Sequence, residues 1–249
     1  MKNNKPVILE KKYHDKIADE FFLQRKYDFI WEIPERMLLL KYKYLSNKSI
    51  VEFGCGPSSV IKKVTQNCNL RLKNYIGVDI SPRMIAIAKK NFPSGTFIIG
   101  DFTHIKLVNS SADTVISLGA LHHSENKNKT LLKWIQILKK GGFLLLREPT
   151  LEALKKGMGA SPIEEGIDVD EICKYLVNNN FIIVKKIFFC SPIFHLLNRA
   201  LIKIFGDFWR KNEFFWHPVM VFDIILCNTL GSKFKNFKGD SIALVAKKL

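Results

Sequence analysis

The sequence is poor in cysteine and has no long apolar run, and both absences exclude classes of protein. Its 249 residues contain five cysteines, an odd number with no Cys-x-x-Cys pair, which argues against a disulfide framework and a zinc ribbon. Apolar stretches stay shorter than the roughly 18 residues that a transmembrane helix needs. Residues 1–16 lack an apolar core and do not resemble a signal peptide. We therefore expect a cytoplasmic protein with reduced thiols.

Acidic residues are few relative to basic ones. The chain has 39 Lys and Arg against 23 Asp and Glu, a net charge of +16, which fits a nucleic acid or an anionic membrane surface as a partner. Most of the basic residues are lysines scattered as doublets, whereas arginine is the side chain that favours bidentate contacts to phosphates and bases. The pattern favours solvated helix and strand ends over a nucleic-acid site.

The apolar residues, 47% of the chain, indicate a large core. Short runs rich in β-branched residues alternate with helical periodicities, which is typical of a parallel sheet with crossover helices. We predict an α/β fold: a Rossmann-like, seven-stranded, mostly parallel sheet with helices on both faces. The expected strands are residues 49–53, 75–79, 96–99, 114–118, 143–147, 181–189 and 242–246. Helices are expected from Ser81-Pro82 to about residue 91, over 126–139 before Gly141-Gly142, and from Asp168 or Asp170.

Two segments lie outside this alternation. Residues 1–48 are predicted to form a helical cap, residues 49–189 the core, and residues 241–249 its final strand. Residues 190–240 form an aromatic-rich helical insertion, interpreted as a lid, an acceptor pocket or an interface, including that of a dimer. Over 194–216, apolar residues recur at helical spacing beside Arg199 and Lys203, and five aromatic residues follow; such a stretch can make a peripheral membrane contact.

Residues that suit ligand binding follow four consecutive strands. Gly54 and Gly56 follow the first strand, and glycines let the backbone approach a ligand because no Cβ intervenes. Asp79 ends the second strand, where a carboxylate can accept ribose hydroxyls. Asp101 follows the third strand, and Leu118 ends the fourth. The carboxyl ends of parallel strands form the crevice in which open α/β sheets bind ligands. A dinucleotide is an alternative ligand, although Ser59 replaces the third glycine of that motif.

The motifs together resemble the class I S-adenosylmethionine-dependent methyltransferase family, most closely the branch that methylates small molecules, quinones and lipids. They are Glu-x-Gly-x-Gly at 52–56, Gly-Val-Asp-Ile-Ser at 77–81, Gly-Asp-Phe at 100–102, Leu-His-His at 121–123 and Leu-Lys-Lys-Gly-Gly at 138–142. The resemblance covers about residues 49–189 and the final strand. Ser58 departs from it, because the family often has a third glycine there.

The resemblance implies S-adenosyl-L-methionine as cofactor and assigns roles around it. Gly54 and Gly56 would lie against the methionine moiety, and Glu52 would help to position its amino group. Asp79 would hold the ribose. The other implied contacts are Ile80 on the adenine, Asp101 and Phe102 at the adenine edge and face, and Leu118 beside the sulfonium. Cys55, between the two glycines, is expected to fill space beside the cofactor and not to act as a nucleophile.

Methyl transfer needs orientation above all, and a base only when the acceptor carries a proton of high pKa. His123 follows the fourth strand and is the candidate base; the alternative is that the pair His122-His123 caps the next helix and shapes the pocket. Tyr13 and His14, in the predicted cap, are candidates to close the pocket on the substrate. The sequence has no His-x-x-x-His or Asp/His cluster, so we expect no metal site.

These observations predict methyl transfer to a small, apolar or lipid- or glycan-linked acceptor, most readily at oxygen. The alternatives are a non-catalytic S-adenosylmethionine-binding protein, an RNA methyltransferase and a nucleotide-dependent dehydrogenase. Strong, salt-sensitive RNA binding would mark the RNA enzyme.

Overall fold

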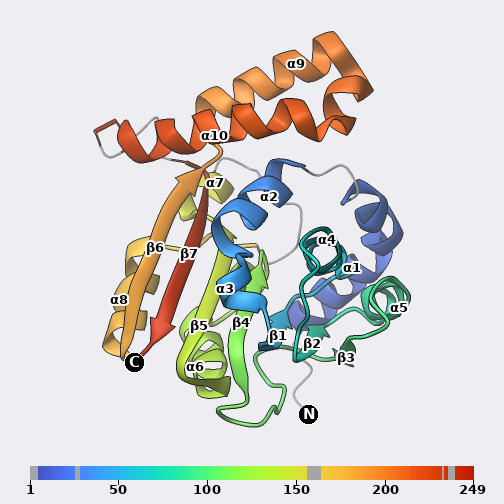
Figure 1. Cartoon of the computed structure of the whole chain (residues 1–249), viewed down its shortest axis with the longest axis vertical. Helices are drawn as coiled ribbons and strands as arrows, with labels where there is room; N and C mark the ends of the chain where they lie inside the picture. The colour runs from blue at the N-terminus through green and yellow to red at the C-terminus, as the bar shows by residue number, and fades with distance from the viewer. Residues whose placement is uncertain (1–4, 26–28, 156–163, 232, 235–238) are drawn as a thin grey trace.

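The computed structural model describes residues 5–25, 29–155, 164–231, 233–234 and 239–249. A seven-stranded sheet with the order β3-β2-β1-β4-β5-β7-β6 forms its centre (Figure 1). β7 runs antiparallel to both of its neighbours, and the other pairs are parallel. This confirms the predicted Rossmann-like fold. The strands are β1 Ser49–Phe53, β2 Asn74–Asp79, β3 Thr96–Ile99, β4 Ala112–Leu118, β5 Leu138–Pro149, β6 Phe181–Phe189 and β7 Ser241–Lys248.

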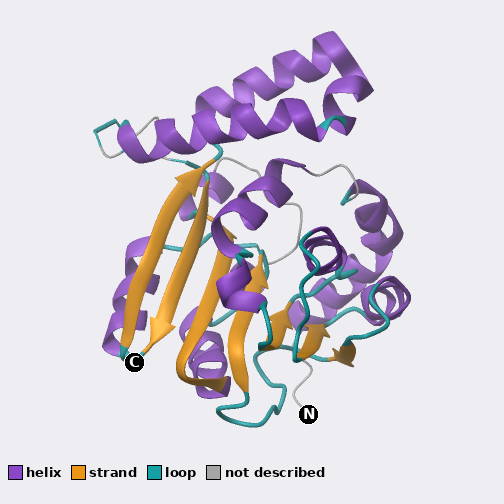
Figure 2. Cartoon of the chain, in the orientation of Figure 1, coloured by secondary structure: helices purple, strands orange, loops and turns teal. Residues whose placement is uncertain are grey.

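Helices cover both faces of the sheet (Figure 2). Successive strand residues point to opposite faces, so in β4 Val115 belongs to one buried cluster and Ile116 to the other. The helices are α1 Lys5–Gln24, α2 Phe29–Pro34, the π-helical turn η1 Glu35–Leu39, α3 Tyr42–Leu45, α4 Ser59–Asn67, α5 Pro82–Asn91, the 3-10 turn η2 Leu121–His123, α6 Lys127–Ile137, α7 Leu151–Lys155, α8 Val169–Asn178, α9 Pro192–Lys211 and α10 Glu213–Thr229.

Polar caps set the starts of three helices where the sequence predicts them. Ser81 accepts a hydrogen bond from the Met84 N–H with proline at the first helical position, and Asn126 and Asp168 cap α6 and α8. The predicted end of α6 is wrong, because the helix stops at Ile137 and not near residue 139. Leu138 already pairs with Ala112 of β4, so the glycines at 141–142 lie inside β5.

The predicted N-terminal cap lies over the sheet as α1, α2, η1 and α3, and its residues 1–4 and 26–28 fall outside the described chain. Two carboxylates of α1 fix it to the start of α5. The Ser81 hydroxyl donates to Asp15 Oδ1 at 2.5 Å, and the Arg83 Nε donates to Asp19 Oδ2 at 2.8 Å. These contacts hold α1 beside the ends of β1 and β2, where the ligand crevice is expected.

The aromatic-rich insertion is a helical hairpin of α9 and α10, which projects above the sheet in Figure 1. At its base, the buried Asp223 carboxylate accepts hydrogen bonds from the N–H groups of Cys190 and Ser191. Trp209 and Trp216 are buried, with ring centroids 5.0 Å apart. The hairpin is therefore anchored through a polar base and an aromatic core. In the part of the chain that the structure describes, no helix has the length and apolarity to cross a bilayer.

Candidate cofactor site

A pocket of about 1040 Å³, counted to its open mouth, lies at the carboxyl ends of β1, β2 and β4 and beyond β3. α1 forms one wall with Val7, Glu10, His14 and Phe21. Their spacing of three, four and seven residues places them on one face of the helix. One face of α1 therefore belongs to the pocket wall.

The loop after β1 is built on two glycines with left-handed backbone. Gly54 has φ +68°, and a Cβ there would lie 2.3 Å from the Cβ of Ala120. Gly56 has φ +50° and faces the pocket, where its nearest neighbour would be the Phe21 ring at 3.7 Å. Gly54 is thus required by packing, while Gly56 leaves bare backbone toward a ligand. The resemblance puts the methionine end of S-adenosylmethionine at this cradle.

Asp79 lines the pocket at the end of β2. Its Oδ2 accepts the Gly56 N–H and its Oδ1 accepts the Ser81 N–H, both at 2.9 Å. Burial raises the pKa of Asp79, and these two donors oppose the shift. Each carboxylate oxygen can accept a further hydrogen bond, which is what the two hydroxyls of a ribose require. Ile80, next in the chain, also lines the pocket.

Asp101 and Phe102 also lie on the pocket wall, after β3. Asp101 accepts the Thr103 N–H at 2.8 Å and lies 2.7 Å from Nδ1 of His104. Phe102 packs edge-on against Trp134, with ring centroids 5.9 Å apart. The carboxylate and the ring are therefore held in place beside the space where the resemblance puts the adenine.

Two residues of the first motif lie behind the pocket wall. The Glu52 carboxyl is buried and accepts a 2.5 Å hydrogen bond from the Tyr75 hydroxyl, which is also 3.1 Å from the Ser58 hydroxyl. Burial raises the pKa of Glu52 to about 8. Burial also raises the pKa of the Cys55 thiol, whose sulfur packs against Gly77. Neither side chain lines the pocket, so Glu52 would act on a ligand only through the loop above it.

The histidines of η2 meet those of α1. His123 lines the pocket, as do His14 and Glu10. The rings of His14 and His123 are in edge-to-face contact at 5.1 Å, and Glu10 Oε2 lies 3.2 Å from His14 Nε2 and 3.5 Å from His123 Nδ1. Burial lowers the pKa of His123, which favours its neutral form. Tyr13 is absent from the lining and packs its ring against His14, at 5.3 Å.

His122 does not line the pocket; a buried glutamate holds it underneath. Glu148 Oε2 lies 2.8 Å from His122 Nδ1, and its Oε1 accepts the N–H groups of Ala120 and Leu121. Burial alone would lower the pKa of His122, but the hydrogen bonds and charges of Glu148 and Glu164 together outweigh burial, and the pKa is raised. The sequence analysis missed Glu148. Its position at the end of β5, the strand next to β4, could have indicated that it lies near the residues that follow β4.

A second missed group fixes the end of β4. The guanidinium of Arg147 donates to the Leu118 carbonyl at 2.8 Å and to Oε1 of the buried Glu35 at 2.9 Å. It also lies where a Cβ on Gly119 would stand. Leu118 and Gly119 line the pocket, so Arg147 connects the predicted cap with the pocket wall.

Two groups of three potential metal ligands occur among the described residues, although no metal site is expected from the sequence. They are Glu10, His14 and His123, and His122, His123 and Glu164. Within each group the ligand atoms lie within 4.8 Å of one another. The first group faces the pocket, and its members already form hydrogen-bonding or ionic contacts with each other.

Comparisons with known proteins agree with this architecture. Residues 51–146 match the family model described as "Methyltransferase domain". An uncharacterized methyltransferase of Bacillus cytotoxicus is 34% identical over 108 residues, which are 41% of this chain and 49% of that protein. The chain therefore spans about half the length of the curated relatives it matches.

Solved structures show the same fold over most of the chain. A methyltransferase crystallised with the Haloferax volcanii Trm112 activator superposes with a TM-score of 0.66 at 16% identity, covering 96% of each chain. The N-methyltransferase NodS of Bradyrhizobium japonicum, crystallised with S-adenosyl-L-homocysteine, has a TM-score of 0.58 at 12% identity and covers 89% of this chain and 88% of its own.

The sheet order, the glycine loop and the matched domain define a class I methyltransferase fold. Within that fold, residues 51–146 match a methyltransferase domain.

Proposed function

We propose that this protein transfers a methyl group from S-adenosylmethionine to a small, apolar or lipid- or glycan-linked acceptor, at oxygen. The observation that carries the proposal is the meeting of Gly56, Asp79 and Asp101 in one pocket that also contains His123. The first three suit the cofactor and the fourth suits a hydroxyl acceptor. We also propose that the protein belongs to the methyltransferase branch that acts on small molecules, quinones and lipids.

S-adenosylmethionine, when bound, supplies a methyl group already activated on a sulfonium. The chain has to orient the acceptor and accept its proton. Leu118 and Gly119 form a part of the pocket wall that Arg147 holds in place, and the resemblance puts the sulfonium beside Leu118. His123, kept neutral by its lowered pKa, would take the proton of an acceptor hydroxyl. Glu10, 3.5 Å from Nδ1 of His123, stabilises the imidazolium that results.

The acceptor's apolar character is inferred from the insertion. Family members commonly have a short connection between their last two strands, whereas α9 and α10 occupy it here. A lipid-linked acceptor remains in the membrane, so we include a peripheral membrane position through residues 194–216 in the proposal. The side chains of residues 207 and 210 lie outside the described part of that segment.

Other functions make different predictions. A non-catalytic sensor would bind S-adenosylmethionine and transfer nothing, and an RNA methyltransferase would bind RNA in a salt-dependent manner. The Haloferax neighbour was crystallised with an activator, so a protein partner is a further possibility for this chain.

The test is transfer of an isotopically labelled methyl group from S-adenosylmethionine to a total lipid extract, compared with total RNA. We expect the label in the lipid fraction, in an alkali-stable ether or a base-labile ester. Asp79→Ala should abolish incorporation. Label in RNA, or none in any fraction despite cofactor binding, would overturn the assignment of the acceptor.

A further inference from the structure

The hairpin of α9 and α10 exposes large apolar side chains on its outside. Phe214 is 81% exposed, Leu196 70%, Ile204 69% and Phe222 60%. Six more are exposed by 40% or more: Ile193, Leu197, Phe205, Phe208, Phe215 and Ile225. Scattered apolar residues are ordinary on a protein surface, but ten within two adjoining helices form a patch of the kind that marks an interaction site.

The exposed residues follow helical spacing. In α10, Phe214, Pro218, Phe222 and Ile225 are exposed at intervals of four, four and three residues, so they share one face. Trp216, Met220, Asp223 and Cys227 are buried on another face of the same helix. In α9, Ile193, Leu197 and Ile204 are exposed at intervals of four and seven residues. The backbone leaves the helical conformation at Gly206, with φ +54° and ψ −130°, so the exposed Phe208 lies beyond a kink. Each helix thus has an inner face that anchors it and an apolar face that remains in solvent.

The Lys, Arg, Asp and Glu side chains that are exposed on the described part of the hairpin are all basic. Arg199, Lys203 and Lys211 are exposed. Of the acidic side chains described there, Glu213 is paired with Arg36 and Asp223 is buried at the hairpin base. The chain as a whole has a net charge of +16. Basic residues beside an apolar, aromatic face are the combination that binds anionic lipid surfaces.

The hairpin lies at the edge of the sheet where the parallel strands end. β4, β5 and β6 point their carboxyl ends toward it, as Figure 1 shows. The cofactor pocket opens at the carboxyl ends of β1, β2 and β4, so pocket and hairpin share the same edge of one sheet. A surface contacted by the hairpin therefore faces the side of the protein that contains the pocket.

We propose that the outer faces of α9 and α10 dock on an anionic membrane, with Phe214, Phe222 and Ile204 in the interface and Arg199 and Lys203 at the lipid headgroups. Docking would present a membrane-borne acceptor to the pocket. This consequence rests on the proposed function. The buried Phe194, Trp209 and Trp216 take no part in the contact, and the docking surface extends beyond residues 194–216 into α10.

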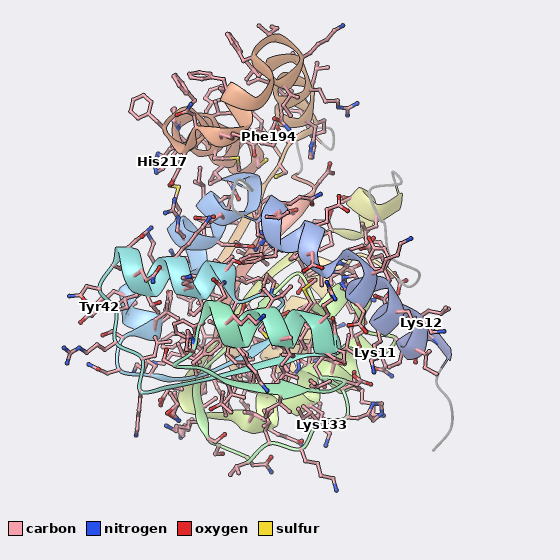
Figure 3. All side chains as sticks on the ribbon, turned by 90° about the vertical axis from the view of Figure 1, so that its right-hand side faces the viewer. Lys11, Lys12, Tyr42, Lys133, Phe194 and His217 are labelled. Atoms are coloured by element: carbon pink, nitrogen blue, oxygen red, sulfur yellow. The ribbon has the colours of Figure 1, made fainter. Side chains whose placement is uncertain are left out.

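Vesicle flotation of the full chain tests this, with phosphatidylcholine vesicles that contain or lack phosphatidylglycerol. We expect binding to the anionic vesicles, weakened by salt, and about tenfold or greater loss in F214S/F222S, because each substitution removes an apolar anchor from the interface. Tyr42→Ser is the matched aromatic control, because Tyr42 is 67% exposed in α3. For charge, R199E/K203E is compared with K133E/K140E; Figure 3 shows Lys133 at the end of the molecule opposite the hairpin residues Phe194 and His217.

Equal vesicle binding by the native protein and F214S/F222S would overturn the proposal. So would a lack of vesicle binding together with a dimer that F214S/F222S dissociates, since a second copy would then cover this face. Titration with S-adenosylhomocysteine separates this proposal from the proposed function. F214S/F222S should bind it as the native protein does, and failure of the native protein to bind it would refute the methyltransferase while leaving the docking result intact.

Discussion

The backbone N–H of Gly56 donates a hydrogen bond to Oδ2 of Asp79 at 2.9 Å, and this bond ties the loop after β1 to the end of β2. The same carboxylate accepts the Ser81 N–H. The Asp79 side chain therefore fixes the glycine loop through Gly56 and the residue before α5 through Ser81. Its remaining lone pairs face the pocket. Loss of Asp79 should affect the cofactor site through both position and direct contact.

The two glycines of the loop should respond differently to substitution. Gly54→Ala places a Cβ 2.3 Å from Ala120, so we expect overpacking of about 1–3 kcal/mol in addition to the backbone strain. Gly141→Ala is the control, since its φ of +77° imposes comparable strain with nothing within 4 Å. Urea denaturation of both variants measures the difference. Equal destabilisation would contradict the packing role of Gly54.

Glu52 should make stability depend on pH. Its pKa is raised by burial from the usual 4.5 to about 8, so the folded state holds a proton that the unfolded state loses over that interval. Stability is fully present below the unfolded pKa and falls as pH rises toward 8, by at most about 1.4 kcal/mol per pH unit. Glu52→Gln should flatten this slope in denaturation series. An unchanged slope would mean that Glu52 is ionised in the folded protein.

His123→Gln should reduce methyl transfer by about 10²-fold or more, the usual contribution of a general base, with little change in S-adenosylhomocysteine affinity. In the native enzyme, the acidic limb of the rate profile should lie below the ordinary histidine range, because burial lowers the pKa of His123. His104→Gln is the control, as His104 also lines the pocket but contacts Asp101. A similar rate for both variants would remove His123 as the base.

Glu148→Gln should be strongly destabilising. An amide NH₂ would face the His122 N–H and Nδ1, where Glu148 Oε2 now lies, and breaking a buried charged pair typically costs about 3–5 kcal/mol. Glu165→Gln alters an exposed side chain that pairs with Lys127 and should change stability by less than about 1 kcal/mol. Thermal unfolding distinguishes them.

Methyl transfer should withstand chelators. Glu10 forms ionic contacts with His14 and His123, and the proposed proton transfer needs only a neutral imidazole. Activity is measured after treatment with EDTA and again after addition of zinc. Loss followed by recovery would show that this cluster holds a metal ion.

Much of the fold could be predicted from the sequence because it depends on local patterns. β-branched runs identified all seven strands, and Ser81, Asn126 and Asp168 identified helix starts. The end of α6 was misplaced because pairing of Leu138 with β4, a long-range contact, overrides the local glycine signal.

Some residues of the candidate site could be predicted from local patterns, and others depend on long-range contacts. Residues that follow strands, such as Asp79 and Asp101, could be placed because parallel strands share an edge. Glu148 and Arg147 could not, because their roles depend on partners from β4 and η1. The face of α1 that carries Val7, Glu10 and His14 has helical spacing in the sequence, but only the packing of α1 on α5 shows that it covers the pocket.

The most direct test of the account is calorimetric titration of the native protein and Asp79→Ala with S-adenosylhomocysteine and with NADH. We predict binding of S-adenosylhomocysteine to the native protein, loss of about 10²-fold or more in affinity for Asp79→Ala through the ribose contacts, and no binding of NADH. Preferential binding of NADH, or no binding of either ligand to a folded native protein, would contradict the assignment of this pocket to S-adenosylmethionine.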